Sequence, residues 1–282
     1  MAGALSSEAN GPECDEGFER LEDFLGFLEE NAWLSDPQVA ASIAEHAVQS
    51  GISSAFLGTV PADEVELLGP QYRESLLARG LNPRMRAVLD ALAALPGAGD
   101  PGSFRVYAPE ALSEFARQLR GRFPGFTGSE FLPGEEDRMR FAAAPHQDLA
   151  ALTLPDGEFD AVVSNDVFEH LPDLDRALSE VARVLRPGGV MLATFPMNYG
   201  REESIQRAVL EGGEVRHLLE PEYHGDPVDP DGALVFQVPG WEILARTRKA
   251  GFSGAEMRLV SSRRAGITAS GLAGILMMRA VR

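Results

Sequence analysis

The clearest pattern of apolar and polar positions lies in the second half of the chain. The apolar run Phe159–Ser164 predicts a strand that is buried on both faces, as strands of parallel sheets are. From Leu174 to Leu185 apolar residues recur at helical spacing, which predicts an amphipathic helix with Asp173 as its N-cap. Pro187–Gly189 ends that helix, and Val190–Phe195 predicts a second buried strand. The pattern therefore predicts a strand–helix–strand crossover within a parallel sheet.

The turn between the first of these strands and the helix is rich in polar side chains. It contains Asn165, Asp166, Phe168, Glu169 and His170. Ligands of open α/β sheets bind beyond the carboxyl ends of the strands, so this turn is a candidate site. The alternative is a capped, solvated turn that binds nothing.

Three short motifs in the same region carry a resemblance to a known family. They are Phe159-Asp160, Glu169-His170-Leu171 and Leu185–Gly189. Through them the segment resembles the fourth strand, the following helix and the fifth strand of class I S-adenosylmethionine-dependent methyltransferases. The resemblance extends over about residues 104–196. It implies an α/β fold, namely a Rossmann-like, mostly parallel sheet of seven strands with an antiparallel last hairpin.

Further apolar runs predict the other elements of such a domain, which we place at residues 103–282 with an insertion at 197–240. In chain order these are the strand Phe104–Tyr107, the helix Glu110–Phe123, the strands Phe126–Glu130 and Phe141–Pro145, the helix Trp241–Ala250, and the strands Ala255–Val260 and Gly271–Val281.

The first 95 residues follow a different pattern. Residues 1–17 are small and acidic, and we expect a mobile N-terminus there. Residues 18–95 predict a helical appendage, with helices at Phe18–Trp33, Pro37–Gly51, Pro61–Leu68, Tyr72–Leu77 and Arg84–Leu95. Such an appendage serves either as a cap over a site or as a packing or dimerisation element, and the sequence leaves a homodimer open.

The turn after the first strand departs from the family pattern. Methyltransferases of this class have a glycine-rich turn there, whereas this chain has Val106-Tyr107-Ala108-Pro109-Glu110. Glycine allows unusual backbone angles and close approach of a ligand, and Pro109 removes a donor. Either the cofactor is held differently or it is not held.

The resemblance nevertheless implies a set of cofactor-binding residues. Glu130 matches the acidic residue that accepts hydrogen bonds from both ribose hydroxyls, because one carboxylate can accept several donors. Asp148 matches the residue that receives the adenine amino group, with Leu149 packing on the ring. The full cofactor-binding set that we expect is Tyr107, Glu130, Phe131, Asp148, Leu149, Asn165 and Asp166.

The insertion supplies candidates for the acceptor side. Its Glu222–Pro227 stretch (EYHGDP) resembles one found in a bacterial group of these methyltransferases whose glycine loop is also degraded. His170 and His224 are the catalytic candidates, since a base that titrates near neutrality helps to deprotonate a hydroxyl nucleophile. The substrate-binding candidates are Phe168, Glu169, Tyr199, Tyr223 and Asp226. The alternatives are a structural His170 and a turn-rich surface loop around His224.

A metal site in the insertion would require His217 and His224 to converge with Asp226 or Asp229. Their spacing matches no recognised ligand pattern, so we expect no metal.

Composition limits the class of partner. The net charge of −18 argues against nucleic acid and against an anionic membrane surface. Cys14 is the single cysteine, which excludes internal disulfides and a cysteine metal cluster. The acidic N-terminus has no signal pattern and no apolar run is long enough to span a membrane, so we expect a cytoplasmic protein with a small-molecule substrate.

The leading hypothesis is a methyltransferase that uses S-adenosylmethionine and acts on oxygen or nitrogen of a sugar or natural-product intermediate. A variant would transfer a different group from the same cofactor. The rival class is a non-catalytic Rossmann-like binding or scaffold protein that has lost the cofactor. A nicotinamide dehydrogenase is less favoured, because its pyrophosphate needs the glycine loop even more.

Overall fold

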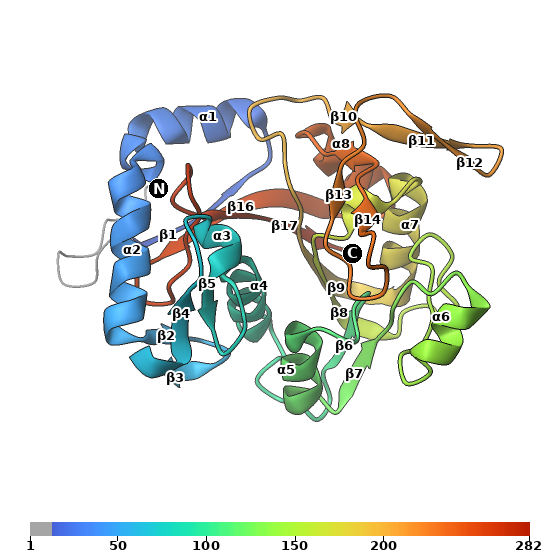
Figure 1. Ribbon diagram of the computed structural model, residues 1–282, viewed down its shortest axis with the longest axis horizontal. Helices are drawn as coiled ribbons and strands as arrows, with labels where there is room; N and C mark the ends of the chain where they lie inside the picture. Colours follow the sequence, from blue (N-terminus) through green and yellow to red (C-terminus); the bar gives the residue numbers. More distant parts are fainter. Residues whose placement is uncertain (1–12) are drawn as a thin grey trace. The chain divides into compact units, whose positions relative to one another are not determined.

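The computed structural model describes residues 13–282, which form two compact units (Figure 1). The first unit comprises the chain up to Gly99 together with Met257–Met277. The second comprises Asp100–Glu256 together with Met278–Arg282. Among the described residues, no helix is long and apolar enough to cross a membrane.

A seven-stranded mixed sheet confirms the predicted fold class. Its strand order is β1 (Glu13–Phe18), β16 (Gly254–Ser262), β17 (Ile275–Val281), β9 (Leu185–Thr194), β8 (Phe159–Asn165), β6 (Arg105–Ala108) and β7 (Gly125–Gly128). The four strands β9, β8, β6 and β7 are parallel, and β17 runs antiparallel to β9. This is a Rossmann-like sheet with an antiparallel end.

The second unit contains the crossover that the sequence predicts. The helix α7 (Leu174–Val184) lies between β8 and β9, and its apolar stripe is buried. The Asp173 carboxylate accepts the Arg176 N–H at 3.0 Å, which confirms the expected N-cap. The helix α5 (Glu114–Arg122) follows β6 and begins later than expected, because Ser113 caps it by accepting the Ala116 N–H.

The strand expected at Phe141–Pro145 is wrong. These residues form a turn after the helix α6 (Glu135–Arg140), and only a single bridge joins Glu130 to His146. The run FAAAP is short, its Phe141 is only partly buried, and Pro145 has no N–H to donate.

The seventh strand is instead β1, which pairs antiparallel with β16 from Glu13↔Ser262 to Phe18↔Met257. Regular structure therefore begins at Glu13, inside the segment expected to be mobile, while residues 1–12 lie outside the described residues.

The first unit is less helical than predicted. Three of its expected helices are confirmed as α1 (Leu21–Glu30), α2 (Pro37–Ser50) and α4 (Pro83–Ala93). Between them lie two small hairpins, β2 (Ile52–Ser54) with β3 (Gly58–Val60), and β4 (Val65–Leu67) with β5 (Leu76–Ala78), and the one-turn helix α3 (Tyr72–Ser75). The helix expected at Pro61–Leu68 is wrong, because only Ala62–Glu64 forms a short 3-10 turn and Val65–Leu67 pairs with β5.

The insertion folds into three short antiparallel pairs before the helix α8 (Glu242–Lys249) (Figure 1). They are β10 (Ile205–Gln206) with β15 (Gln237–Val238), β11 (Ala208–Glu211) with β12 (Glu214–His217), and β13 (Tyr223–His224) with β14 (Ala233–Leu234). The Phe236 N–H donates to the Glu169 carbonyl at 2.8 Å. The insertion is thereby fixed to the turn that follows β8.

Candidate functional site

The turn after β8 is held in an unusual backbone conformation. Asp166 has a φ of +50°, and its N–H donates to the Thr194 carbonyl at 2.8 Å. A positive φ is uncommon for residues other than glycine, and aspartate tolerates it better than most. The Thr194 hydroxyl also lies 3.5 Å from the side-chain oxygen of Asn165. These contacts fix the side chain of Asn165 at the strand exit.

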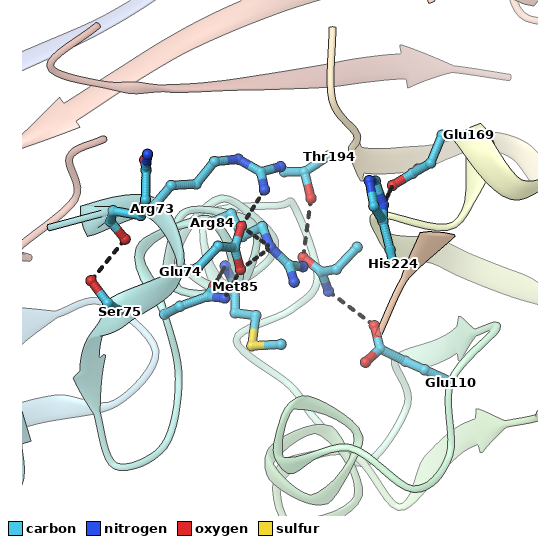
Figure 2. Close-up of polar contacts among 12 residues, drawn as sticks. Arg73, Glu74, Ser75, Arg84, Met85, Glu110, Glu169, Thr194 and His224 are labelled. Atoms are coloured by element: carbon cyan, nitrogen blue, oxygen red, sulfur yellow. Dashed lines mark hydrogen bonds and ion pairs between the residues drawn. The ribbon is translucent and has the colours of Figure 1, made fainter. Parts of the chain in front are cut away.

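The glycine-free loop after β6 is connected to this exit by Glu110. One carboxylate oxygen of Glu110 accepts a hydrogen bond from the Asn165 amide at 3.0 Å (Figure 2). The other accepts a hydrogen bond from the Ser113 hydroxyl at 2.5 Å. A Cβ atom on Gly128 of β7 would lie 2.8 Å from the Glu110 carbonyl oxygen. The loop after β6 therefore packs closely against the neighbouring strand β7, and this close packing requires a glycine at position 128.

Glu130, directly after β7, is tied to the same loop. Its Oε1 accepts the N–H groups of Ala111 at 2.8 Å and Leu112 at 2.9 Å. Its Oε2 has no hydrogen bond to another described residue. Burial raises the pKa of Glu130, the two N–H groups counteract this, and the negative charge of Asp226 adds to the rise. One oxygen of this carboxylate thus supports the loop, and the other can accept hydrogen bonds from a ligand.

The remaining cofactor candidates lie in different environments. Tyr107 is fully buried within β6, where its hydroxyl bonds to Ser129 at 2.9 Å and its ring packs on Phe159, so it is not among the residues at the strand exits. Asp148 accepts the Ala150 N–H at 2.8 Å, and Leu149 is buried. Phe131 is 59% exposed beside His146. The roles of these side chains stay predictions.

A second group of side chains joins the β8 exit to the insertion. Glu169 is completely buried, and its Oε1 lies 3.5 Å from Nδ1 of His224 (Figure 2). The same oxygen lies 3.6 Å from Nε2 of His170. The two imidazole rings are 5.1 Å apart and nearly perpendicular. The structure therefore brings together both catalytic candidates and one substrate-binding candidate from distant parts of the sequence.

Each imidazole of this group is oriented by a second partner. The Nδ1–H of His170 donates to the Leu234 carbonyl at 2.9 Å, and Nε2 of His224 lies 3.4 Å from Glu222. The Glu169 carboxylate is the main cause that raises the pKa of His224, and partial burial opposes it. Sequence reasoning missed Glu222, which directly precedes the two-residue strand β13 that carries His224.

The other acceptor candidates do not join this group. Phe168 is buried and stacks on Phe195 at 5.9 Å. Tyr199 and Tyr223 are 44% and 53% exposed. The Asp226 carboxylate accepts the N–H groups of Val228 and Asp229, so it shapes the loop.

Comparison with known proteins bears on the strands β7, β8 and β9 and the turns that follow β7 and β8. Residues 127–193 match a family model described as a methyltransferase domain. This match supports the resemblance for β7, β8, α7 and β9, and it includes Glu130, Asn165 and Glu169. The insertion with His224 lies outside it.

Two curated relatives and one solved structure illustrate the extent of the similarity. A probable S-adenosylmethionine-dependent methyltransferase of Mycolicibacterium smegmatis is 53% identical over 82 residues, which cover 27% of this chain and 32% of the relative. A malonyl-(acyl-carrier protein) O-methyltransferase of Serratia marcescens is 35% identical over 100 residues, covering 34% and 39%. An S-adenosylmethionine-dependent methyltransferase structure from Mesorhizobium loti has a TM-score of 0.45 at 20% identity, covering 70% of this chain and 98% of that one. The chain spans about a third of the length of these curated relatives.

Proposed function

We propose that this chain is an S-adenosylmethionine-dependent methyltransferase that transfers a methyl group to oxygen or nitrogen of a small molecule, such as a sugar or natural-product intermediate. The observation that carries the proposal is Glu130, a buried carboxylate at the exit of β7 with one oxygen available, inside the segment that matches a methyltransferase domain. The overall charge of −18 suits a neutral or cationic acceptor better than a polyanion.

The residues present fit this cofactor. Oε2 of Glu130 would accept hydrogen bonds from the ribose hydroxyls. Asp148 would accept a hydrogen bond from the adenine amino group, and Leu149 would pack on the adenine ring. Glu110, directed to Asn165, places a carboxylate where a ligand ammonium group could be recognised. When bound, the cofactor supplies an electrophilic methyl group on a sulfonium, and the chain has only to hold and orient the reactants.

The acceptor side of the proposed site is the group Glu169, His170 and His224. The Leu234 carbonyl and Glu222 restrict the two rings, so the nitrogens that face Glu169 are pre-positioned. We expect substitution of either histidine to reduce turnover while leaving cofactor affinity unchanged, because neither touches Glu130 or its loop.

Titration calorimetry with S-adenosylmethionine and S-adenosylhomocysteine tests the proposal. Charged hydrogen bonds contribute about 1.5–3 kcal/mol, so Glu130→Ala should weaken binding at least about tenfold. Glu136→Ala, an exposed acid in α6, is the matched control and should bind like the wild type. A folded wild-type chain that binds neither ligand would instead favour the non-catalytic binding protein, and methyl-acceptor screening would distinguish methyl transfer from transfer of another group.

A further inference from the structure

The group Glu169, His170 and His224 has features beyond those that a pair of catalytic histidines requires. One ligand atom of each residue lies within 4.8 Å of those of the other two. Within the described part of the chain, this is the set of histidine, cysteine and acidic side chains close enough together to hold a metal ion. It differs from the set of insertion residues considered in the sequence analysis, because His217 is exposed on β12.

The buried carboxylate is the first observation that points to a ligand. Glu169 has no exposed surface, and neither of its oxygens has a hydrogen-bond partner in the described structure. The approaches of 3.5 and 3.6 Å to the two rings are too long for good hydrogen bonds. A buried carboxylate without partners is costly, and a bound cation would remove that cost.

The orientation of the imidazoles is the second observation. A carbonyl oxygen can only accept, so Nδ1 of His170 carries the proton and Nε2, which faces Glu169, is left as a lone pair in the neutral ring. Glu222 has the equivalent relation to Nε2 of His224, and Arg207 in turn holds Glu222 at 3.1 Å. Metal-ligating histidines typically donate their other N–H to a carbonyl or carboxylate in this way.

The distances also suit a particular class of ion. Ligand atoms about 2.0–2.1 Å from a tetrahedral zinc ion lie roughly 3.3 Å apart. The observed separations of 3.5 and 3.6 Å are within small side-chain movements of that value. Two imidazoles with one carboxylate is a recurrent zinc ligand set that keeps a fourth position open.

We propose that Glu169, His170 and His224 bind one divalent transition-metal ion of the Zn²⁺ type, with a fourth position open to an oxygen of the acceptor. The metal site itself stands on the cluster alone, and only the assignment of the fourth ligand rests on the proposed function. An alcohol or water oxygen bound to such an ion loses its proton to solvent more readily. The site therefore favours a hydroxyl-bearing acceptor over an amine.

Metal titration of the full chain, freed of any affinity tag and stripped with a chelator, tests this proposal. We expect Zn²⁺ to bind with a stoichiometry of one and to raise the melting temperature. Co²⁺ should give the visible absorption of a four- or five-coordinate nitrogen–oxygen site. The control is His217→Ala, which removes an exposed histidine of the same insertion and should bind as the wild type does.

Three variants separate a metal site from a protonated histidine pair. His170→Ala, His224→Ala and Glu169→Gln should each weaken Zn²⁺ binding by more than about tenfold, because each removes a ligand. Glu169→Gln relieves the buried charge, so it should fold without metal and lose the metal-induced rise in melting temperature. Because His224 is 31% exposed, His224→Ala provides a second variant that does not depend on Glu169.

If the wild type bound Zn²⁺ no more tightly than His224→Ala does, the proposal would be overturned. The buried Glu169 carboxylate would then be compensated by a protonated histidine instead of a metal ion. Titrations with S-adenosylhomocysteine, run with and without Zn²⁺, keep the two proposals apart. Cofactor binding without any Zn²⁺ site would overturn the metal inference alone. Zn²⁺ binding without cofactor binding would support the metal site and overturn the proposed function.

Discussion

Arg86 of α4 is completely buried in the first unit, and backbone carbonyls surround its guanidinium. It donates to Leu76 at 3.0 Å, Ala265 at 3.2 Å and Gly266 at 2.6 Å, and also to Leu81. Burial lowers its pKa to about 9, and the negative charge of Asp90 opposes that effect. Arg86 thus joins the start of α4, β5 and the 265–266 turn through one side chain.

Replacement of Arg86 by methionine should destabilise the fold strongly. The substitution keeps a long apolar stem but leaves four carbonyls without this donor, at roughly 1–3 kcal/mol for each one that stays buried. We expect a loss of at least about 3 kcal/mol in urea unfolding. The control is Arg79→Met, which removes a partly exposed ion pair with Glu64 and should cost less than about 1 kcal/mol. Equal losses in the two variants would contradict the structural role of Arg86.

The raised pKa of Glu130 leads to a pH prediction. The ribose hydroxyls need the ionised carboxylate, and burial shifts its protonation to a higher pH than an ordinary glutamate. As the pH falls, affinity for S-adenosylhomocysteine should therefore begin to decline at a pH higher than about 4.3, the pKa of an ordinary glutamate. Calorimetry over a pH series checks this. Glu130→Gln should bind weakly at every pH and lack that decline, and a parallel decline in Glu130→Gln would assign the effect to another group.

At the scale of elements, strong local periodicity was sufficient to predict helices, whereas the pairing of strands that are distant in sequence could not be predicted. The helices α2, α4 and α7 follow directly from their apolar spacing, and α7 also from its N-cap Asp173. The strand β1 could not be predicted, because ECDEGF contributes only Cys14 and Phe18 to the buried face and its partner β16 lies near the other end of the chain. The helix predicted over Val65–Leu67 was wrong because these residues form a strand by pairing with β5, which their own apolar pattern does not indicate.

The candidate site shows the same division. Glu130 could be located by its position at a strand end, and His170 and Glu169 by their motif. Glu169 and His170 lie close to His224 because of how the insertion folds, and the Phe236 N–H of the insertion donates to the Glu169 carbonyl. No local pattern encodes that contact, so the cluster could be found only in three dimensions.

The pairing of β1 with β16 predicts a protected thiol. Cys14 is buried, and burial is the main cause that raises its pKa to about 12, with Glu16 and Asp15 adding to it. A thiol reagent attacks the thiolate, so the native chain should be labelled very slowly at neutral pH and promptly in denaturant. Mass spectrometry of the labelled chain measures this for its single cysteine. Rapid labelling of the native chain would indicate that β1 is not stably paired.

At the scale of the whole molecule, neither unit is formed by one continuous segment. Met257–Met277 belongs to the first unit, and the last five residues, Met278–Arg282, belong to the second. In the second unit Met278–Val281 pairs with Val190–Ala193 of β9. The Gly188 N–H donates to the Arg282 carbonyl, and the Arg282 N–H to the Gly189 carbonyl, both at 2.9 Å. The last residues therefore supply the antiparallel partner of β9, a strand that lies far earlier in the chain.

This organisation predicts that the chain cannot tolerate a very short C-terminal truncation. Ending the chain at Met277 removes the antiparallel partner of β9 and leaves buried backbone groups of that strand unpaired. We expect loss of cooperative thermal unfolding, followed by circular dichroism, and of S-adenosylhomocysteine binding. The matched control deletes residues 210–214, also five residues, from the exposed tip of the β11–β12 hairpin, where surface loops accept shortening. That variant should melt within a few degrees of the wild type. A truncated chain that melts as the control does would show that the second unit folds without its last strand segment, and would count against the pairing of β17 with β9.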